Sequence, residues 1–268
     1  MYTFGFIGVG HMGSSLAEAI CRGDVYGEVV LSDHHTDRLA VFAARNACTM
    51  DCAEYVAKNS RYIFLGVKPQ GMAALFEEIG PTLRAREDRF VLVTMAAGIT
   101  MDRLTELAGG AYPVIRIMTN TPVAVGEGCT LYTVNDKVTA EETDAFLRAM
   151  AYTGKMVEMP EELMDAGGTI SGCGPAYVFQ FLVALANAGK TIGLPEEKAV
   201  ELALQTALGS AKLALETGED PLKLCFDVCS PGGSTIEGVK KLMEGTFAAQ
   251  VESAVKASFD RTCELGNS

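Results

Sequence analysis

The stretch Phe4-Gly-Phe-Ile-Gly-Val-Gly-His-Met-Gly13 decides the fold of this chain. Its apolar start predicts a strand, and the segment from Ser14 to Cys21 that follows it predicts a helix. Between them, Gly8 permits the tight turn, Gly10 lets a pyrophosphate approach the backbone, and Gly13 lets helix and strand pack closely. The amides of the first helical turn then face the phosphates. The pattern therefore predicts a dinucleotide-binding domain, with a glycine turn that binds no ligand as the alternative.

The composition is that of an acidic protein with enough apolar residues for a core. Of the 268 residues, 49% are hydrophobic, and the formal net charge is −12. The sequence holds no basic stripe, so nucleic acid is not an expected partner. The acidity is typical of a solvated cytosolic surface. An anionic ligand must therefore be held by local backbone amides rather than by the overall charge.

The cysteines and histidines predict neither a disulfide framework nor a metal site. The eight cysteines include no Cys-x-x-Cys pair, which favours reduced thiols in the cytosol. The three histidines, His11, His34 and His35, do not have zinc-ligand spacing. The N-terminus passes directly into a strand, so no targeting segment is expected and the predicted location is the cytoplasm.

Strand and helix signals alternate from residue 1 to about residue 158. The expected strands are Tyr2–Ile7, Val29–Ser32, Tyr62–Val67, Phe90–Thr94, Val114–Met118, Cys129–Val134 and Lys155–Glu158. The expected helices include Asp37–Arg45, Met72–Gly80, Met101–Leu107 and Ala140–Met150, the last opened by a capping box at Thr139 and Glu142. This alternation predicts an α/β fold, with a Rossmann-like, doubly wound parallel sheet in residues 1–160.

The strand signals stop after Pro160, and residues 161–268 are predicted to be all-helical. Pro175–Ala188 is apolar nearly all round and predicts a helix buried in the core or in a subunit interface. A membrane span is the alternative, but about 15 residues between glycines fall short of the ~20 that a bilayer needs. Such a helix in so small a domain predicts a partner subunit that covers it.

Pro195 predicts the first turn of a helix that runs to Leu215. A final amphipathic helix has apolar residues from Phe247 to Phe259 along one face.

Asp33 ends the second strand, twenty residues after Gly13. An acidic residue there commonly bonds the ribose 2′-hydroxyl and favours NAD. His34, Thr36 and Arg38 could instead receive a 2′-phosphate, and Asp33 could simply cap the next helix. The choice between NAD and NADP therefore stays open.

Ligands of an open parallel sheet lie beyond the carboxyl ends of its strands. Lys68 and the run Ala96–Gly98 follow two such ends, near the expected ribose and nicotinamide. A solvated turn lysine and simple close packing are the respective alternatives. Asn120 and Thr121 follow the next strand, where a ligand contact and a pure turn role are equally expected.

A second glycine-rich loop, Ser230-Pro-Gly-Gly-Ser-Thr235, leads into a helix. Glycine amides ahead of a helix N-terminus suit a small carboxylate. The spacing of Ser234 and Glu237 predicts a capping box, and the Thr235 hydroxyl could bond a substrate nitrogen or oxygen. A capped loop without a ligand is the alternative.

Together these motifs resemble the pyrroline-5-carboxylate reductase family. The stretches that carry the resemblance, in family order, are Phe6-Ile-Gly-Val-Gly-His-Met-Gly13, Val67-Lys-Pro69, Met95-Ala-Ala-Gly98, Met118-Thr-Asn-Thr-Pro122, Ile170-Ser-Gly-Cys-Gly-Pro-Ala-Tyr177, Ala188-Gly-x-x-x-Gly-Leu-Pro195 and Ser230-Pro-Gly-Gly-Ser-Thr235. The resemblance implies that NAD(P)H donates a hydride to the imine of 1-pyrroline-5-carboxylate, giving L-proline. It also implies a helical domain that interlocks with a second subunit, and dimers that in many members assemble to decamers.

The resemblance also assigns roles to single residues. It implies Thr235 as the catalytic residue, close to the imine nitrogen. The implied substrate-binding residues are Ser230, Gly232, Gly233 and Thr235, and we predict the same role for Ser234 within that loop. The implied cofactor-binding residues are Gly8, Gly10, His11, Met12, Gly13, Lys68, Pro69, Met95 and Ala97. From their positions after strands, Asp33 and Asn120 are also predicted to bind the cofactor.

Three positions depart from the family pattern. Ala53 stands where an asparagine is frequent, which weakens one expected ribose contact. Asp227 stands where many members have asparagine, and Asp33 where NADP-preferring members tend to have a neutral residue.

Two other functions compete with the reductase. A β-hydroxyacid dehydrogenase would need an asparagine one turn after its lysine, but Leu194 follows Lys190 at that spacing. A non-catalytic nicotinamide-binding protein would not need the second glycine-rich loop.

Overall fold

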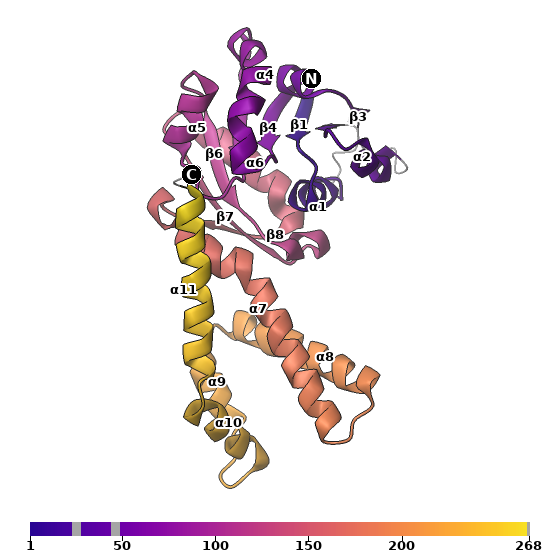
Figure 1. Cartoon of the computed structure of the whole chain (residues 1–268), viewed down its shortest axis with the longest axis vertical. Coiled ribbons are helices and arrows are strands. Elements are labelled where there is room, and N and C mark those ends of the chain that lie inside the picture. Colours follow the sequence, from indigo (N-terminus) through magenta and orange to yellow (C-terminus); the bar gives the residue numbers. More distant parts are fainter. Residues whose placement is uncertain (23–27, 44–48, 267–268) are drawn as a thin grey trace. The chain divides into compact units, whose positions relative to one another are not determined.

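A computed structural model describes residues 1–22, 28–43 and 49–266. The chain divides into two compact units. The first comprises Met1–Cys173 and Ser258–Ser268, and the second comprises Gly174–Ala257. Figure 1 labels most of the strands and helices that build them.

The first unit is built on one mixed sheet. Its strands are β1 (Tyr2–Ile7), β2 (Val29–Ser32), β3 (Thr49–Met50), β4 (Ser60–Leu65), β5 (Val91–Thr94), β6 (Val114–Met118), β7 (Gly128–Val134) and β8 (Gly154–Glu158). Within the described residues the strand order is β3-β2-β1-β4-β5-β6-β7-β8. Strand β1 pairs in parallel with both β2 and β4, so the chain reverses its direction of travel across the sheet there. This confirms the predicted doubly wound fold.

Helices cover both faces of this sheet. They are α1 (His11–Ile20), α2 (Thr36–Ala43), α3 (Ala53–Asn59), α4 (Met72–Arg84), α5 (Met101–Ala108) and α6 (Ala140–Ala149). Residues of α1, α2 and α6 share one buried apolar cluster, and residues of α3, α4 and α5 share the other. Short 3₁₀ turns lie in the connections between these elements: η1 (Pro69–Gly71), η2 (Thr121–Val125), η3 (Met150–Thr153) and η4 (Glu161–Leu163).

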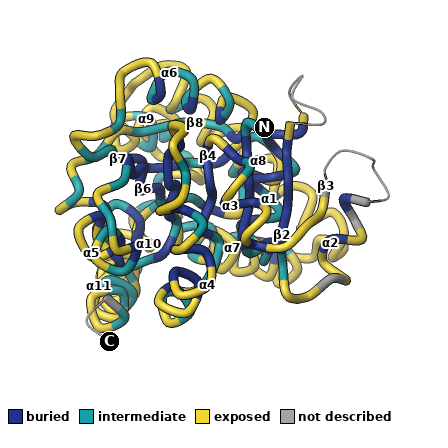
Figure 2. The backbone as a smooth tube through the Cα atoms, turned by 90° about the horizontal axis from the view of Figure 1, so that it is seen from above, coloured by how far each residue is buried: buried dark blue, intermediate teal, exposed yellow. Residues whose placement is uncertain are grey.

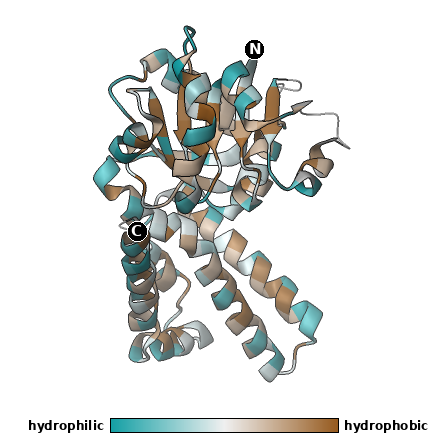
Figure 3. Ribbon diagram, turned by 45° about the horizontal axis from the view of Figure 1, so that its top comes forward, coloured by the Kyte–Doolittle hydropathy of each residue, from teal (hydrophilic) through white to brown (hydrophobic). Residues whose placement is uncertain are grey.

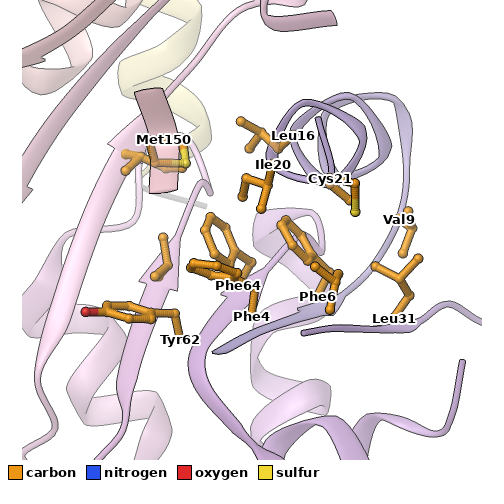
Figure 4. Close-up of a cluster of buried hydrophobic side chains, with 14 of the residues drawn as sticks. Phe4, Phe6, Val9, Leu16, Ile20, Cys21, Leu31, Tyr62, Phe64 and Met150 are labelled. Carbon is orange, nitrogen blue, oxygen red and sulfur yellow. The ribbon is translucent and has the colours of Figure 1, made fainter. Parts of the chain in front are cut away.

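The strands are buried on both faces, as a parallel sheet between helices must be. Dark-blue strands fill the centre of this unit in Figure 2. Alternate side chains of β1 point to opposite faces, with Phe4 and Phe6 in one cluster and Ile7 in the other. Figure 4 shows Phe6 close to Phe64, and their rings stack with centroids 4.3 Å apart. This stacking packs β1 against β4, the strand with which it pairs in parallel.

Strand β7 corrects the expectation of an all-parallel sheet, because it runs antiparallel to β6. The connection between them, residues 119–127, contains only the 3₁₀ turn η2. A parallel pair needs a crossover of a dozen or more residues, so this connection is too short to return the chain. Strand β8 then pairs in parallel with β7, and α6 supplies the crossover. The capping box predicted at Thr139 and Glu142 is confirmed.

Arg116 is a buried charge in the middle of β6, with 1% of its side chain exposed. Its guanidinium donates to Asp165 at 2.6 Å and to Glu161 at 3.4 Å. Glu161 also accepts the backbone N–H of Met101 at 2.7 Å. The pairs tie the sheet to η4 and to the start of the long helix α7 (Met164–Thr191).

The second unit is helical throughout its described residues, apart from turns and loops. It holds most of α7, then α8 (Glu196–Thr217), α9 (Pro221–Asp227), α10 (Ser234–Glu244) and the start of α11 (Phe247–Gly266). Pro195 precedes α8 directly, as predicted. Asp220 caps α9 by accepting the N–H groups of Leu222 and Lys223. The sequence did not predict α9, because Gly218–Pro221 indicated only a break.

Helix α7 differs from its prediction in length and in burial. It begins eleven residues before Pro175 and has 28 residues. The prediction that this helix is too short to span a membrane is therefore wrong. The stretch Glu161–Thr191 is long and apolar enough to cross a membrane by length and composition. In the single chain many of its apolar side chains are exposed, with Phe179 at 58% and Val183 at 55%. Figure 3 shows brown, hydrophobic residues along this helix.

The second unit buries few apolar side chains of its own. Its buried cluster consists of Ala186, Ala199 and Ala203, with Leu182 packed against them. Large apolar side chains of α8, such as Leu204 and Leu208, are half exposed. Burial of apolar surface is the main force that folds a domain, so this unit needs a surface from outside itself.

Candidate active site

The glycine loop closes against the end of β4. Gly8 has a φ of +91°, a left-handed conformation that favours glycine, and its N–H donates to the Ser32 carbonyl at 2.8 Å. A Cβ on Gly13 would lie 2.4 Å from the Gly8 oxygen, and one on Gly66 would lie 2.1 Å from it. Gly66 was not singled out from the sequence, because its partner comes from a distant strand. The three glycines therefore allow the backbones of β1, β4 and α1 to come into direct contact, with no side chain between them.

Gly10 has a different environment from its neighbours. A Cβ at Gly10 would meet no described atom within 4 Å, so the backbone borders open space. Gly10 is also the N-cap of α1, and no described side chain caps this helix. The N–H groups of the first turn therefore have no helical partner and can receive an anion. His11 and Met12, both predicted to bind the cofactor, begin this turn.

An open pocket of about 220 Å³ lies beside this turn. It is lined by Val9, Gly10, His11, Ser14, Glu18, Arg38 and Phe42. Three of its sides are therefore a glycine loop, a helix N-terminus and a cation, which together suit a nucleotide with a diphosphate. The residues present thus fit the predicted dinucleotide. Ser14, Glu18 and Phe42 were not predicted, although Ser14 and Glu18 lie one and two turns into α1.

Asp33 follows β2 and turns its carboxylate toward the glycine loop. Its Oδ2 accepts the Val9 N–H at 2.6 Å, and its Oδ1 accepts the His35 N–H at 2.7 Å. Arg38 lies 3.6 Å from Oδ2. Burial alone would raise the pKa of Asp33, but the two backbone hydrogen bonds and Arg38 together hold the pKa below its usual value. Asp33 is therefore ionised at neutral pH. The side chain of Thr36 lies outside the described residues.

The other predicted cofactor residues follow neighbouring strands at one edge of the sheet. Lys68 and Pro69 follow β4, and Met95 and Ala97 follow β5. Because β1, β4 and β5 are adjacent and parallel, these residues lie along the same edge as the glycine loop. Lys68 is exposed, while Met95 packs partly against the apolar cluster. Their contact with a cofactor stays a prediction.

Asn120 follows β6 and has a structural partner on each side of its amide. Its Nδ2 donates to the Ser171 carbonyl at 2.9 Å, and its Oδ1 accepts the Cys129 N–H at 3.0 Å. In a regular helix the Ser171 carbonyl would accept the N–H of residue 175, but Pro175 has none. Asn120 replaces that missing hydrogen bond. This is how Pro175 is accommodated inside α7, whereas the sequence indicated that a helix starts there.

The second glycine-rich loop lies in the second unit, between α9 and α10. Gly232 has a φ of +70°, and the Gly233 N–H donates to the Ser230 carbonyl at 3.0 Å. The predicted capping box is wrong, because Ser234 is the first residue of α10 and Gly233 is its N-cap. Gly233 has no side chain that could cap, so the first amides of α10 have no side-chain partner at this position. Thr235 is the second residue of that turn and is exposed.

Two residues named from the sequence have structural partners. The Lys190 ammonium donates to Glu196 at 3.2 Å, on an exposed surface. Asp227, which departs from the family pattern, accepts from Lys223 at 3.0 Å.

Comparison with known proteins assigns the chain to a family. A model described as pyrroline-5-carboxylate reductase dimerisation matches residues 161–265. A model described as coenzyme F420-dependent NADP oxidoreductase matches residues 3–98. Pyrroline-5-carboxylate reductase of Arabidopsis thaliana is 36% identical over 270 residues, which is 100% of this chain and 96% of that protein. The human pyrroline-5-carboxylate reductase 2 is also 36% identical, over 98% of this chain and 83% of its own.

Solved structures agree with this assignment. The Plasmodium falciparum pyrroline carboxylate reductase with NADP bound has a TM-score of 0.86 at 29% identity, and 99% of this chain and 98% of that chain are covered. The Coxiella burnetii pyrroline-5-carboxylate reductase has a TM-score of 0.89 at 28% identity, with 98% of each chain covered. The chain, which carries both glycine-rich loops of the sequence pattern, belongs to the pyrroline-5-carboxylate reductase family.

Proposed function

We propose that this protein reduces 1-pyrroline-5-carboxylate to L-proline with NAD(P)H. The observation that carries the proposal is the match to reductases of that name along the whole chain, with both loops intact. When bound, NAD(P)H supplies the hydride that the imine carbon accepts. The remaining chemistry is the addition of a proton to the ring nitrogen and the alignment of two bound molecules, which the protein provides.

The first unit offers the means to hold the cofactor. The open backbone at Gly10 and the first amides of α1 suit its diphosphate, because they present N–H groups without helical partners. The pocket between the glycine loop and Arg38 suits its adenosine end. Lys68, Pro69, Met95 and Ala97 extend along the same edge and suit the remainder.

The second unit offers the means to hold the substrate. The left-handed Gly232 and the uncapped first turn of α10 present backbone amides that suit a small carboxylate. The Thr235 hydroxyl is exposed in the same turn, where it can hydrogen-bond the ring nitrogen. That hydrogen bond would polarise the imine or help to protonate it.

The test is oxidation of NADH and NADPH in the presence of 1-pyrroline-5-carboxylate, with reduction of NAD+ and NADP+ by 3-hydroxyacids as the control reaction. We expect turnover with the imine only. Thr235→Ala should lower kcat by roughly 10–1000-fold, the range for one lost transition-state donor. Thr235→Ser keeps the hydroxyl and should retain most of the activity. Turnover of a 3-hydroxyacid, or wild-type kcat in Thr235→Ala, would contradict the proposal.

The assembly and location belong to the same proposal. The dimerisation match covers α7, and the exposed Phe179 and Val183 of that helix support burial against a second copy rather than in a bilayer. We propose a soluble cytoplasmic protein whose dimers assemble further, to a decamer. The net charge of −12 supports the absence of nucleic acid among its partners. Light scattering at several protein concentrations measures the assembly, and vesicle flotation tests membrane association.

A further inference from the structure

The cation that lines the pocket beside the glycine loop is already paired with a carboxylate. Arg38 lines the pocket, and Asp33 lies 3.6 Å from its guanidinium. Only 5% of the Asp33 side chain is exposed, whereas 46% of the Arg38 side chain is. The carboxylate is therefore fixed beneath the pocket wall, and the cation lies at its surface.

The position of Asp33 is held from two sides. The Val9 N–H of the glycine loop and the His35 N–H of its own turn each donate to one carboxylate oxygen. The Nδ1 atom of the His35 ring lies 3.3 Å from Asp33 Oδ1, the oxygen that also accepts the His35 backbone N–H. With both oxygens engaged, the carboxylate cannot rotate away from the pocket when a ligand approaches.

These charges bear on the one difference between the two nicotinamide cofactors. The end of the second strand is where a dinucleotide fold reads the adenosine ribose, and NADPH differs from NADH by a 2′-phosphate there. The Arg38 guanidinium at the pocket surface is already paired with the Asp33 carboxylate. A 2′-phosphate would lie close to that carboxylate and would have to compete with Asp33 for Arg38. A 2′-hydroxyl meets neither cost.

We propose that Asp33 is the specificity-determining residue of the cofactor pocket, and that the pocket takes NADH in preference to NADPH. The proposal rests on the proposed function only in that the pocket binds a nicotinamide dinucleotide. It deepens that function by naming which of the two cofactors the reductase uses. It also sets this chain apart from the Plasmodium falciparum relative, which was solved with NADP bound.

The test is calorimetric titration of NADH and of NADPH into the full-length protein without substrate. We expect wild type to bind NADH roughly tenfold more tightly or better, the equivalent of about 1.4 kcal/mol. Asp33→Asn keeps an oxygen that can accept one backbone N–H but removes the charge and releases Arg38. It should tighten NADPH binding by roughly tenfold and leave NADH unchanged or weaker.

Arg38→Gln supplies the second half of a double-mutant cycle. In wild type it should change NADPH affinity little, because Arg38 is neutralised by Asp33. In the Asp33→Asn background it should abolish the gain in NADPH affinity, because the released guanidinium is what binds the phosphate. Asp88→Asn is the matched control: Asp88 pairs with Arg86 ahead of β5, at the opposite edge of the sheet, and its loss should leave the NADH to NADPH ratio unchanged.

Two results would overturn the proposal. One is a wild-type protein that binds NADPH as tightly as NADH, which needs no variant and therefore does not depend on the folding of Asp33→Asn. The other is an equal change for both cofactors in Asp33→Asn, which would reduce Asp33 to a support of the loop. Because binding is measured without 1-pyrroline-5-carboxylate, a chain that prefers NADH but does not reduce the imine would refute the proposed function alone.

Discussion

Replacement of Asn120 by alanine should destabilise the protein, because it leaves a backbone carbonyl of helix α7 without its hydrogen-bond donor. The side chain is 7% exposed, and its amide joins the Ser171 carbonyl to the Cys129 N–H. Alanine leaves both backbone groups without a partner, and an unpaired buried group costs about 1–3 kcal/mol. Two such groups would cost about 2–6 kcal/mol when fully buried. We expect the free energy of unfolding to fall by about 2–4 kcal/mol, because the partner residues Ser171 and Cys129 are themselves only partly buried.

A second substitution, at Pro175, separates the loss of the Asn120 hydrogen bond from a general loss of packing. Pro175→Ala restores the N–H that a helix normally directs at the Ser171 carbonyl. In that background Asn120→Ala should cost about 1–2 kcal/mol less than in wild type, because one of its two orphaned groups regains a donor. Urea unfolding at one fixed protein concentration measures all four members of the cycle.

A matched control comes from α3. Asn59 donates from its amide to the Tyr55 carbonyl at the exposed end of that helix, and Asn59→Ala should cost less than about 1 kcal/mol. Equal costs for Asn120→Ala with and without Pro175 would refute the idea that Asn120 substitutes for the missing helical hydrogen bond.

Three further predictions follow from the structure. Glu142→Gln should cost about 1–2 kcal/mol at pH 7, because the Arg89 hydrogen bonds hold the pKa of Glu142 below its usual value. That contribution is present above the ordinary glutamate pKa and is lost as pH falls through the lowered one, so urea unfolding of the two proteins should converge in acid. Gly13→Ala should lower Tm, since its Cβ would lie 2.4 Å from a loop oxygen, whereas Gly10→Ala should keep Tm but weaken NADH and NADPH binding in titrations. Phe179→Asp places a charge on the exposed apolar face of α7 and should shift the light-scattering mass from that of the wild-type assembly towards that of the monomer.

Features that depend on a few neighbouring residues could be predicted from the sequence. The turn at Gly8 follows from glycine spacing, because a glycine acts on its own backbone. The helix after it was predicted too, although α1 begins at His11, three residues before the expected Ser14. The capping box at Thr139 is equally local and is present. The one at Ser234 fails because α10 begins one residue earlier than expected, which moves Ser234 from the cap into the helix.

Features that depend on distant partners could not be predicted in the same way. Gly66 matters only because β4 pairs beside β1 and brings it to the Gly8 oxygen. Pro175 indicated a helix start, and only the distant Asn120 amide makes an interior position acceptable. The antiparallel direction of β7 could have been predicted, because the short connection of residues 119–127 is visible in the sequence. A connection of that length cannot join two parallel neighbouring strands.

The second unit couples the stability of the protein to its assembly. Its buried apolar cluster is made of small residues, Ala186, Ala199 and Ala203, while Phe179 and Val183 remain exposed in the single chain. The stabilisation from apolar burial scales with the area removed from water. The exposed apolar side chains lie within the residues that match the dimerisation model, so we expect most of the further burial in this unit to come from contact with a second copy. Thr235 and its loop belong to this same unit. Dissociation should therefore loosen the helices that hold the proposed substrate site, even though Thr235 itself need not contact the partner.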